Sequence, residues 1–195
     1  LEEVIINDIN FDLMNLYLQL KTRIDDVLEQ LYTLQKNFYE HTGEEKWEFF
    51  KACRCRTGYT KKKQEDENIR NAALFLFINR AFRLDPYISA IVHGVQKKHN
   101  TAIDGVAKPA ICDEFMLREV SAILKPVKIL CCDFRECLTY ADDSTFLYMD
   151  PPLANDRHRV TTDLSNRKTY PFPKTDDLSV TSFIKIARSF GAEVY

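Results

Sequence analysis

Short apolar segments, each followed within a few positions by an acidic residue, recur along this chain. They are residues 4–6 before Asp8, residues 127–130 before Asp133, and residues 146–149 before Asp150. Continuous apolar runs of about four residues are typical of strands that are buried on both faces of a parallel sheet. We therefore expect buried parallel strands at these three places, and another strand at residues 192–195.

Longer segments with apolar residues at helical spacing separate the expected strands. They lie at residues 13–34, 68–84, 113–124 and 178–190. The last of them ends before Gly191, and glycine commonly follows the final turn of a helix. This alternation of strands and helices predicts an α/β fold with a doubly wound sheet.

Residues 21–108 do not follow the alternation. The region is long, charged and helical in its pattern, and it contains no convincing strand. A structureless loop of that length would be unusual within a compact domain. We therefore expect an inserted helical subdomain at residues 21–108, with residues 1–20 and 109–195 forming the domain that contains the sheet.

The composition indicates a soluble globular protein. Hydrophobic residues make up 45% of the 195 positions and charged residues 29%, which is a usual balance for such proteins. The longest apolar run, residues 72–78, is too short to cross a membrane, and no secretion leader opens the chain. We expect a cytoplasmic protein, and the start at Leu1 together with the end inside an expected strand indicates a fragment.

The six cysteines do not have the spacing of a metal site. They are Cys53, Cys55, Cys112, Cys131, Cys132 and Cys137. None of them forms a C-x-x-C pair with a matching second pair, so we expect no zinc knuckle and no metal. In a cytoplasm these thiols would be reduced, and several lie in apolar surroundings where cysteine behaves as a small hydrophobic residue.

The acids that follow the expected strands mark a candidate site. In open α/β sheets, ligands bind outside the carboxyl ends of the strands. Asp8, Asp133 and Asp150 would all lie along that edge. Acids at strand ends also cap the helices that follow, so both a functional and a structural role remain open for these three residues.

The tripeptide Asp150-Pro151-Pro152 carries the most specific chemistry. Proline has no backbone N–H, and a residue that precedes proline is pushed toward an extended conformation. The loop therefore offers hydrogen-bond acceptors in a stiff shape, which suits a ligand that donates two hydrogen bonds, such as an amino group. Methylation of an exocyclic amine needs such placement and electrostatic help rather than a strong base. An ordinary proline turn is the alternative.

Three segments resemble one enzyme family. Residues 145–152, Thr-Phe-Leu-Tyr-Met-Asp-Pro-Pro, resemble the catalytic motif of Dam-type DNA adenine methyltransferases, whose usual form is Asp-Pro-Pro-Tyr. Residues 4–17 are similar to the strand and helix that hold the cofactor ribose in that family, and residues 108–135 resemble the segment that leads to the cofactor's adenine. The resemblance spans nearly the whole chain. It implies a Rossmann-like class I methyltransferase sheet with an inserted helical target-recognition subdomain.

The resemblance also implies a function. The expected reaction is methyl transfer from S-adenosylmethionine to the exocyclic amine of adenine in double-stranded DNA, as in restriction–modification. We expect a monomer in the cytoplasm of a bacterial or phage-like system.

The family's site residues can be carried over position by position. Asp8 would bind the ribose hydroxyls of the cofactor, with Ile9 beside its adenine. Asp133 would accept a hydrogen bond from the adenine amine, and Phe134 would pack on that ring, although core packing is the alternative for Phe134. The catalytic motif would be Asp150, Pro151, Pro152 and Leu153, in which the Asp150 carboxylate and the Pro151 carbonyl hold the target amine.

Two departures from the family leave rival hypotheses open. Leu153 replaces the usual tyrosine, and base stacking on an aromatic ring contributes roughly 1–3 kcal/mol. The glycine-rich loop that normally precedes the strand before Asp8 is not found in residues 1–195, which hold only five glycines; either it lies upstream of Leu1 or it never existed. A DNA-binding remnant without catalysis is therefore one alternative. An amino-methyltransferase acting on RNA or on protein glutamine is another, although Asp150 and the Asn7-Asp8 pair favour the adenine enzymes.

A local cationic segment is the expected DNA contact, because the net charge of −2 excludes a generally basic surface. Residues 51–63 hold six cations and no acid. Such residues can neutralise phosphates, and an aromatic residue among them can stack on a base. The candidates are Lys51, Arg54, Arg56, Tyr59, Lys61, Lys62 and Lys63, with Arg157 and Arg159 in a second stretch. A solvated loop is the alternative for residues 51–63, and the target DNA sequence cannot be inferred.

Overall fold

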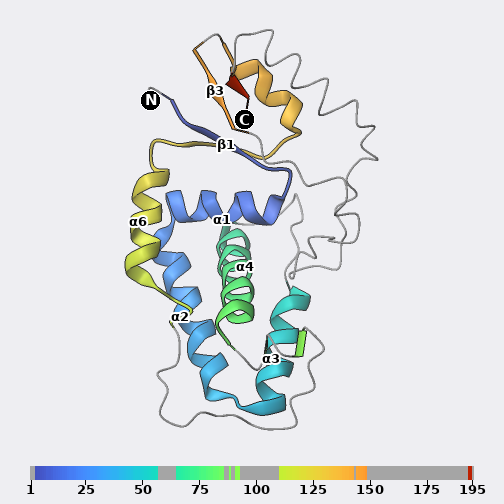
Figure 1. The fold of residues 1–195 in the computed structure, drawn as a ribbon. Helices are drawn as coiled ribbons and strands as arrows, with labels where there is room; N and C mark the ends of the chain where they lie inside the picture. Colours follow the sequence, from blue (N-terminus) through green and yellow to red (C-terminus); the bar gives the residue numbers. More distant parts are fainter. Residues whose placement is uncertain are drawn as a thin grey trace.

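Two pairs of parallel strands and a group of helices make up the described part of the chain (Figure 1). The computed structural model describes residues 3–56, 65–85, 88, 91–92, 110–142, 144–148 and 193–194. The helices are α1 (Phe11–Thr22), α2 (Ile24–Glu40), α3 (Gly43–Arg56), α4 (Glu65–Leu84), α6 (Glu114–Leu124) and the 3-10 helix η1 (Phe134–Tyr140). The strands are β1 (Ile5–Asn7), β2 (Lys128–Leu130), β3 (Phe146–Leu147) and β4 (Glu193–Val194).

The strands pair in parallel across long stretches of sequence. β1 pairs with β2, with Ile6 opposite Ile129 and Asn7 opposite Leu130. β3 pairs with β4, which confirms the strand expected near the end of the chain. In Figure 1 the strands lie at the end of the molecule beyond α1. The α/β class and the parallel pairing predicted from the sequence are therefore confirmed.

The strands are less buried than their apolar sequences predict. Every residue of β1 and β2 is half-buried, with Ile6 and Ile129 packed against the core, and Phe146 in β3 is 59% exposed. The expectation of fully buried strands is wrong for the described residues. These strands are only two or three residues long, so solvent reaches their side chains from the strand ends.

The helix expected over residues 13–34 is two helices. Arg23 has φ −138° and ψ 43°, which is not helical, and it separates α1 from α2. Asp25 and Asp26 lie in the first turn of α2, where negative charge is favourable near the helix N-terminus. Arg23 also forms ion pairs with Asp26 and with Glu65 at the start of α4. The break is thus stabilised by contacts that a helical periodicity does not reveal.

Two helix starts are set by side-chain caps. The Asn10 side chain accepts hydrogen bonds from the backbone N–H groups of Asp12 and Leu13, at 3.0 and 3.1 Å. The Asp113 carboxylate accepts from the N–H of Met116 at 3.1 Å, so α6 begins where the sequence predicts. Such caps satisfy N–H groups that have no partner within the first helical turn.

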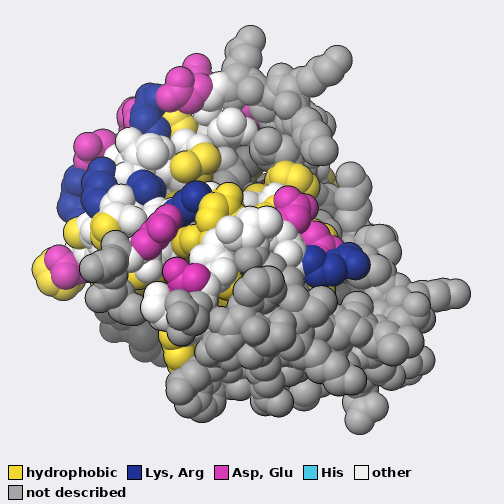
Figure 2. Space-filling model, turned by 90° about the horizontal axis from the view of Figure 1, so that it is seen from above, with side chains coloured by type: hydrophobic (Ala, Val, Ile, Leu, Met, Phe, Trp, Pro, Cys, Tyr) yellow, Lys and Arg dark blue, Asp and Glu magenta, His cyan; other side chains and the backbone are white. Residues whose placement is uncertain are grey.

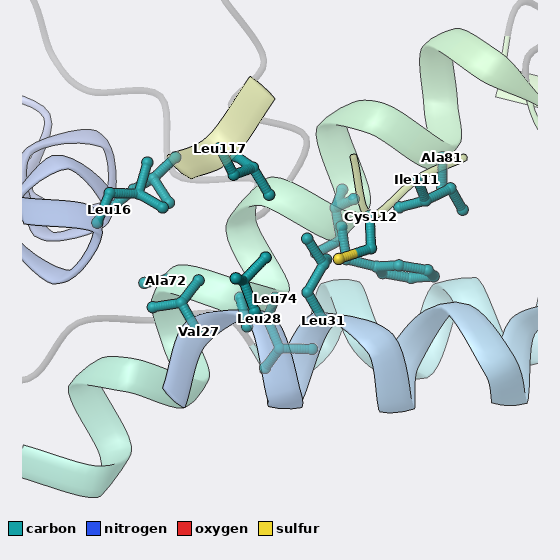
Figure 3. Close-up of a cluster of buried hydrophobic side chains, with 14 of the residues drawn as sticks. Leu16, Val27, Leu28, Leu31, Ala72, Leu74, Ala81, Ile111, Cys112 and Leu117 are labelled. Atoms are coloured by element: carbon teal, nitrogen blue, oxygen red, sulfur yellow. The ribbon is translucent and has the colours of Figure 1, made fainter. Parts of the chain in front are cut away.

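The hydrophobic core lies between the helices. Figure 3 shows side chains from α1 (Leu16), α2 (Leu28 and Leu31), α4 (Leu74) and α6 (Leu117) within one buried cluster. In Figure 1, α4 descends from α1 between α2 and α3. Within residues 21–108, the described elements α2, α3 and α4 are helical, as expected. Because α1 and α6 share this cluster with α2 and α4, the division of the chain into two domains stays a prediction.

All six cysteines are free thiols. No helix among the described residues is both long enough and apolar enough to cross a membrane.

Phe77 of α4 is a residue whose removal should cost much stability. It is fully buried, and its ring packs edge-on against Phe38 of α2 at 5.4 Å between centroids and against Phe49 of α3 at 6.0 Å. We expect Phe77→Ala to lower the free energy of unfolding by about 3–5 kcal/mol, because a cavity remains. Chemical denaturation measures the change. Phe115→Ala, at a ring that is 79% exposed, is the control and should change it by less than about 0.5 kcal/mol.

Candidate functional site

The pairing of β1 with β2 places two of the predicted acids at neighbouring strand ends. Asp8 directly follows Asn7, the last residue of β1, and Asp133 comes three residues after Leu130, the last residue of β2. Because the strands are parallel, both acids lie toward the same edge of the pair. This is the edge at which α/β sheets bind ligands.

Asp8 organises the turn that leads from β1 into α1. Its Oδ1 accepts a hydrogen bond from the backbone N–H of Asn10 at 2.7 Å, an arrangement typical of an Asx turn. Asn10 in turn caps α1. Among the described residues, no hydrogen bond to the other oxygen, Oδ2, is recorded, and the side chain is half-buried. Asp8 can therefore accept hydrogen bonds from a ligand with the turn intact.

Asn7 ties the two strand ends together. Its Nδ2 donates to the carbonyl oxygen of Cys132 at 3.0 Å, and its Oδ1 accepts from the backbone N–H of Cys132 at 3.0 Å. The Sγ of Cys132 donates to the same Oδ1 at 3.3 Å. One side chain thus satisfies both backbone groups of the residue that precedes Asp133.

Arg135 holds the Asp133 carboxylate in place. Arg135 donates to Oδ1 from its backbone N–H at 2.9 Å and from Nε at 2.8 Å, and to Oδ2 from a terminal guanidinium nitrogen at 2.7 Å. Chiefly because of the side-chain hydrogen bonds, the pKa of Asp133 falls from 3.8 to about 2, although partial burial opposes the shift. Asp133 is therefore an anion with one acceptor position left among the roughly four of a carboxylate.

Ile9 and Phe134, the two apolar residues expected beside the cofactor's adenine, differ in how exposed their side chains are. Ile9, in the turn after Asp8, is 51% exposed. Phe134, the first residue of η1, is half-buried, and the Arg135 guanidinium carbon lies 5.6 Å from its ring centroid. Each of them directly follows an acid of the site along the chain, so both are candidates to cover an apolar ring that the acids would bind at its polar edge.

The cysteines near the site are neutral thiols at neutral pH. Burial, followed by the charge of Asp8, raises the pKa of Cys131 to about 11. Burial likewise raises the pKa of Cys137 to about 11. The thiolate is the form that attacks electrophiles, so these two residues are poor nucleophiles. In the part of the chain that the structure describes, no cluster of His, Cys, Asp and Glu could hold a metal ion.

The predicted catalytic motif lies outside the described residues. These residues are Asp150, Pro151, Pro152 and Leu153. β3 ends at Leu147, three residues before Asp150 along the chain. The prediction that Asp150 joins Asp8 and Asp133 at one edge therefore stays a prediction.

Only part of the predicted DNA contact can be placed. Lys51 on α3 forms an ion pair with Glu48 at 2.5 Å and lies 5.7 Å from the Trp47 ring centroid. Arg54 is half-buried on the same helix, and Arg56 is its last residue. The other candidates, Tyr59, Lys61, Lys62, Lys63, Arg157 and Arg159, lie outside the described residues. On the described part of the face in Figure 2, cations and acids are interspersed.

Comparison with known proteins identifies the family. The model of the D12 class N6 adenine-specific DNA methyltransferases matches residues 1–188. The chain belongs to this family. The chain is 31% identical to the Type II methyltransferase M.MjaIII of Methanocaldococcus jannaschii over 195 residues, which is 99% of this chain and 64% of that protein.

A second relative of the chain comes from Lactococcus lactis. The Type II methyltransferase M1.LlaDCHI of Lactococcus lactis subsp. cremoris is 28% identical over 157 residues, which is 77% of this chain and 50% of that protein. The chain thus spans between half and two thirds of the length of these relatives. No solved structure matches it significantly.

Two residues of this candidate site were missed by reasoning from the sequence. Asn7 was noted only as a neighbour of Asp8, and Arg135 only as part of a matching segment. An amide at the last position of a strand and an arginine two residues after an acid were the available signals. Neither is specific without knowledge of which strands pair, because both residue types are common on surfaces.

The ion pair with Arg135 determines the pH range over which the Asp133 carboxyl is ionised. A folded-state pKa of about 2, below the ordinary 3.8, means that the stabilisation from this carboxylate is complete above roughly pH 4 and is lost as the pH falls through 2. We expect Arg135→Ala to raise the pKa of Asp133 toward 3.8, as carboxyl NMR titration would measure. Arg118→Ala, which removes a cation of α6 paired with Asp25 and Glu114, should leave that pKa unchanged. An unaltered pKa in Arg135→Ala would show that the pair is unimportant in solution.

Proposed function

We propose that this chain forms the catalytic part of an enzyme that transfers a methyl group from S-adenosylmethionine to the exocyclic amine of adenine in double-stranded DNA. The observation that carries the proposal is the match of residues 1–188 to an adenine-specific DNA methyltransferase family. The neighbouring positions of Asp8 and Asp133 at the ends of paired strands support it. The names of the relatives further suggest a Type II methyltransferase, the modifying partner in restriction–modification.

The residues at the strand ends fit the proposed cofactor. A ribose offers two hydroxyl donors, and Asp8 has an oxygen to which no described residue is recorded as donating. An adenine amine is a donor, and the Asp133 carboxylate retains one acceptor position beside Arg135. Ile9 and Phe134 provide apolar surface for the adenine ring. When bound, S-adenosylmethionine would supply an electrophilic methyl group on its sulfonium.

The chain's own part in the reaction would be to place the target amine. Asp150 and the carbonyl of Pro151 would accept the two hydrogens of that amine, which turns its lone pair toward the methyl group. The amine nitrogen would take up the methyl group that the cofactor supplies and would then lose one proton to solvent. Orientation and electrostatics supply most of the rate enhancement in such a site. The neutral thiols of Cys131 and Cys137 would take no part.

The base would have to leave the duplex to reach this site. Enzymes that modify a base extrude it into the active site, at a cost of a few kcal/mol for unstacking. Lys51, Arg54 and Arg56 would contribute to phosphate binding together with the cations of residues 57–63. Arg157 and Arg159, which follow the catalytic motif, would contact DNA near the extruded adenine.

A DNA-binding remnant without catalysis remains the second candidate, because Leu153 stands where the resembled enzymes have tyrosine. Calorimetric binding of S-adenosylmethionine by the complete protein separates the two functions. The enzyme must bind the cofactor and label adenine in DNA with its methyl group. DNA binding without cofactor binding would favour the remnant.

Asp150→Ala tests the proposed reaction. We expect it to lower the rate of methyl transfer by on the order of 10²–10³-fold, since one preorganised hydrogen-bonding group at the reacting centre is lost. Transfer of a radiolabelled methyl group to DNA measures the rate, and circular dichroism checks the fold. Glu119→Ala removes an exposed acid of α6 and should retain full activity. Activity retained in Asp150→Ala would refute the role of this carboxylate.

Leu153→Tyr tests whether an aromatic residue improves the site. A ring that stacks on the base should strengthen binding of target DNA by roughly tenfold to a hundredfold, corresponding to about 1–3 kcal/mol. Leu153→Phe should share the gain because stacking needs no hydroxyl group, whereas Leu153→Ile should not. Fluorescence anisotropy with DNA that contains the target adenine measures the affinity. Equal affinities for all three variants would mean that position 153 does not contact the base.

A further inference from the structure

The backbone of β1 leaves its partner strand immediately after Asn7. Asn7 lies opposite Leu130, the last residue of β2. Beyond this point the Asx turn at Asp8 directs the chain into the cap of α1. Backbone pairing with β1 therefore does not hold the residues after β2 in place, and Asp133 is one of these residues.

The side chain of Asn7 continues the pairing where the backbone stops. Its amide has a donor and an acceptor arranged as in a peptide group, and both engage Cys132, two residues beyond Leu130, at 3.0 Å each. The orientation of the amide follows from its partners, because only Nδ2 can donate to a carbonyl and only Oδ1 can accept from an N–H. The thiol of Cys132 adds a third hydrogen bond to Oδ1 at 3.3 Å.

The two residues joined by this amide are the immediate neighbours of the two candidate cofactor ligands. Asn7 precedes Asp8, and Cys132 precedes Asp133. We propose that Asn7 is a positioning residue, which sets the separation of the Asp8 and Asp133 carboxylates and thereby the affinity for the nucleoside part of S-adenosylmethionine. This inference rests on the proposed function. Asn7 itself keeps both halves of its amide engaged with Cys132, so it acts through its neighbours.

A positioning role for Asn7 and a purely stabilising role predict different effects on cofactor binding. A residue that only stabilises the fold would lower the free energy of unfolding and leave the cofactor affinity of the folded protein unchanged. A positioning residue weakens cofactor binding even when the protein is fully folded. It should also leave the reaction of the bound cofactor nearly intact, because the methyl group lies at the other end of the cofactor from the adenosine.

The experiment compares Asn7→Ala and Asn7→Asp with the unchanged complete protein. Asn7→Ala removes the amide, and the isosteric Asn7→Asp keeps an acceptor for the Cys132 N–H but sets a carboxylate against the Cys132 carbonyl. We expect both to raise the Kd for S-adenosylmethionine by about tenfold or more, as loss of a partly buried hydrogen-bonding pair predicts. The KM for the cofactor should rise in parallel, while kcat at saturating cofactor and the Kd for DNA should change by less than about threefold.

Ser121→Ala is the matched control. Its hydroxyl donates to the Leu20 carbonyl at 2.6 Å, so it also joins two distant elements through a buried side chain-to-backbone hydrogen bond, but away from the strand ends. It should lower the melting temperature and leave the Kd for the cofactor unchanged. Amide hydrogen exchange at Cys132 should accelerate in Asn7→Ala, which removes the acceptor of the Cys132 N–H, and not in Ser121→Ala.

The outcomes separate this inference from the proposed function. If the unchanged protein binds no S-adenosylmethionine, the proposed function fails and the role of Asn7 fails with it. If the unchanged protein binds and the folded Asn7 variants bind equally well, the positioning role alone is refuted. Should Asn7→Ala not fold, Asn7→Asp decides the question, because it preserves the volume of the side chain.

Discussion

The parallel pairing of β1 with β2 is the constraint on which the candidate site depends. Two strands of three residues are too short to be stable by themselves. Hydrogen bonds from side chains hold the pair at both ends: Lys21 of α1 donates to the Val127 carbonyl at 2.7 Å before β2 begins, and Asn7 engages Cys132 after it ends. The helical core stabilises α6, which precedes β2, and α1, which follows β1.

The residues at these strand ends are suited to binding and orienting a ligand. Asp133 is held as an anion by Arg135, and Asp8 shapes the turn before α1 with one carboxylate oxygen. The nearby Cys131 and Cys137 are kept neutral because burial raises their pKa values. The site therefore offers fixed acceptors and apolar cover rather than a strong base or a reactive thiolate. Such groups suit the proposed binding of a nucleoside.

Local sequence patterns were enough to predict some of the strands and helix starts. The apolar runs before Asp8 and Asp133 predicted the paired strands, and Asp113 marked the start of α6. The pattern failed at Arg23, where an uninterrupted helical periodicity hides a break that ion pairs to Asp26 and Glu65 stabilise. It also overestimated the burial of the strands, because an apolar run does not show how short a strand will be.

The sequence by itself determined the class of fold, the acids after the strands and the resemblance to adenine methyltransferases. These properties depend on residues that are adjacent or periodic along the chain, and a local pattern is enough to show them. Only the tertiary structure decided that Asn7 bonds to Cys132 and that the Asp133 carboxylate is occupied by Arg135. The Asn7 contact spans 125 positions, and the Arg135 contact depends on the backbone bend after β2. Residue types alone specify neither, because the same side chains elsewhere would bond to water.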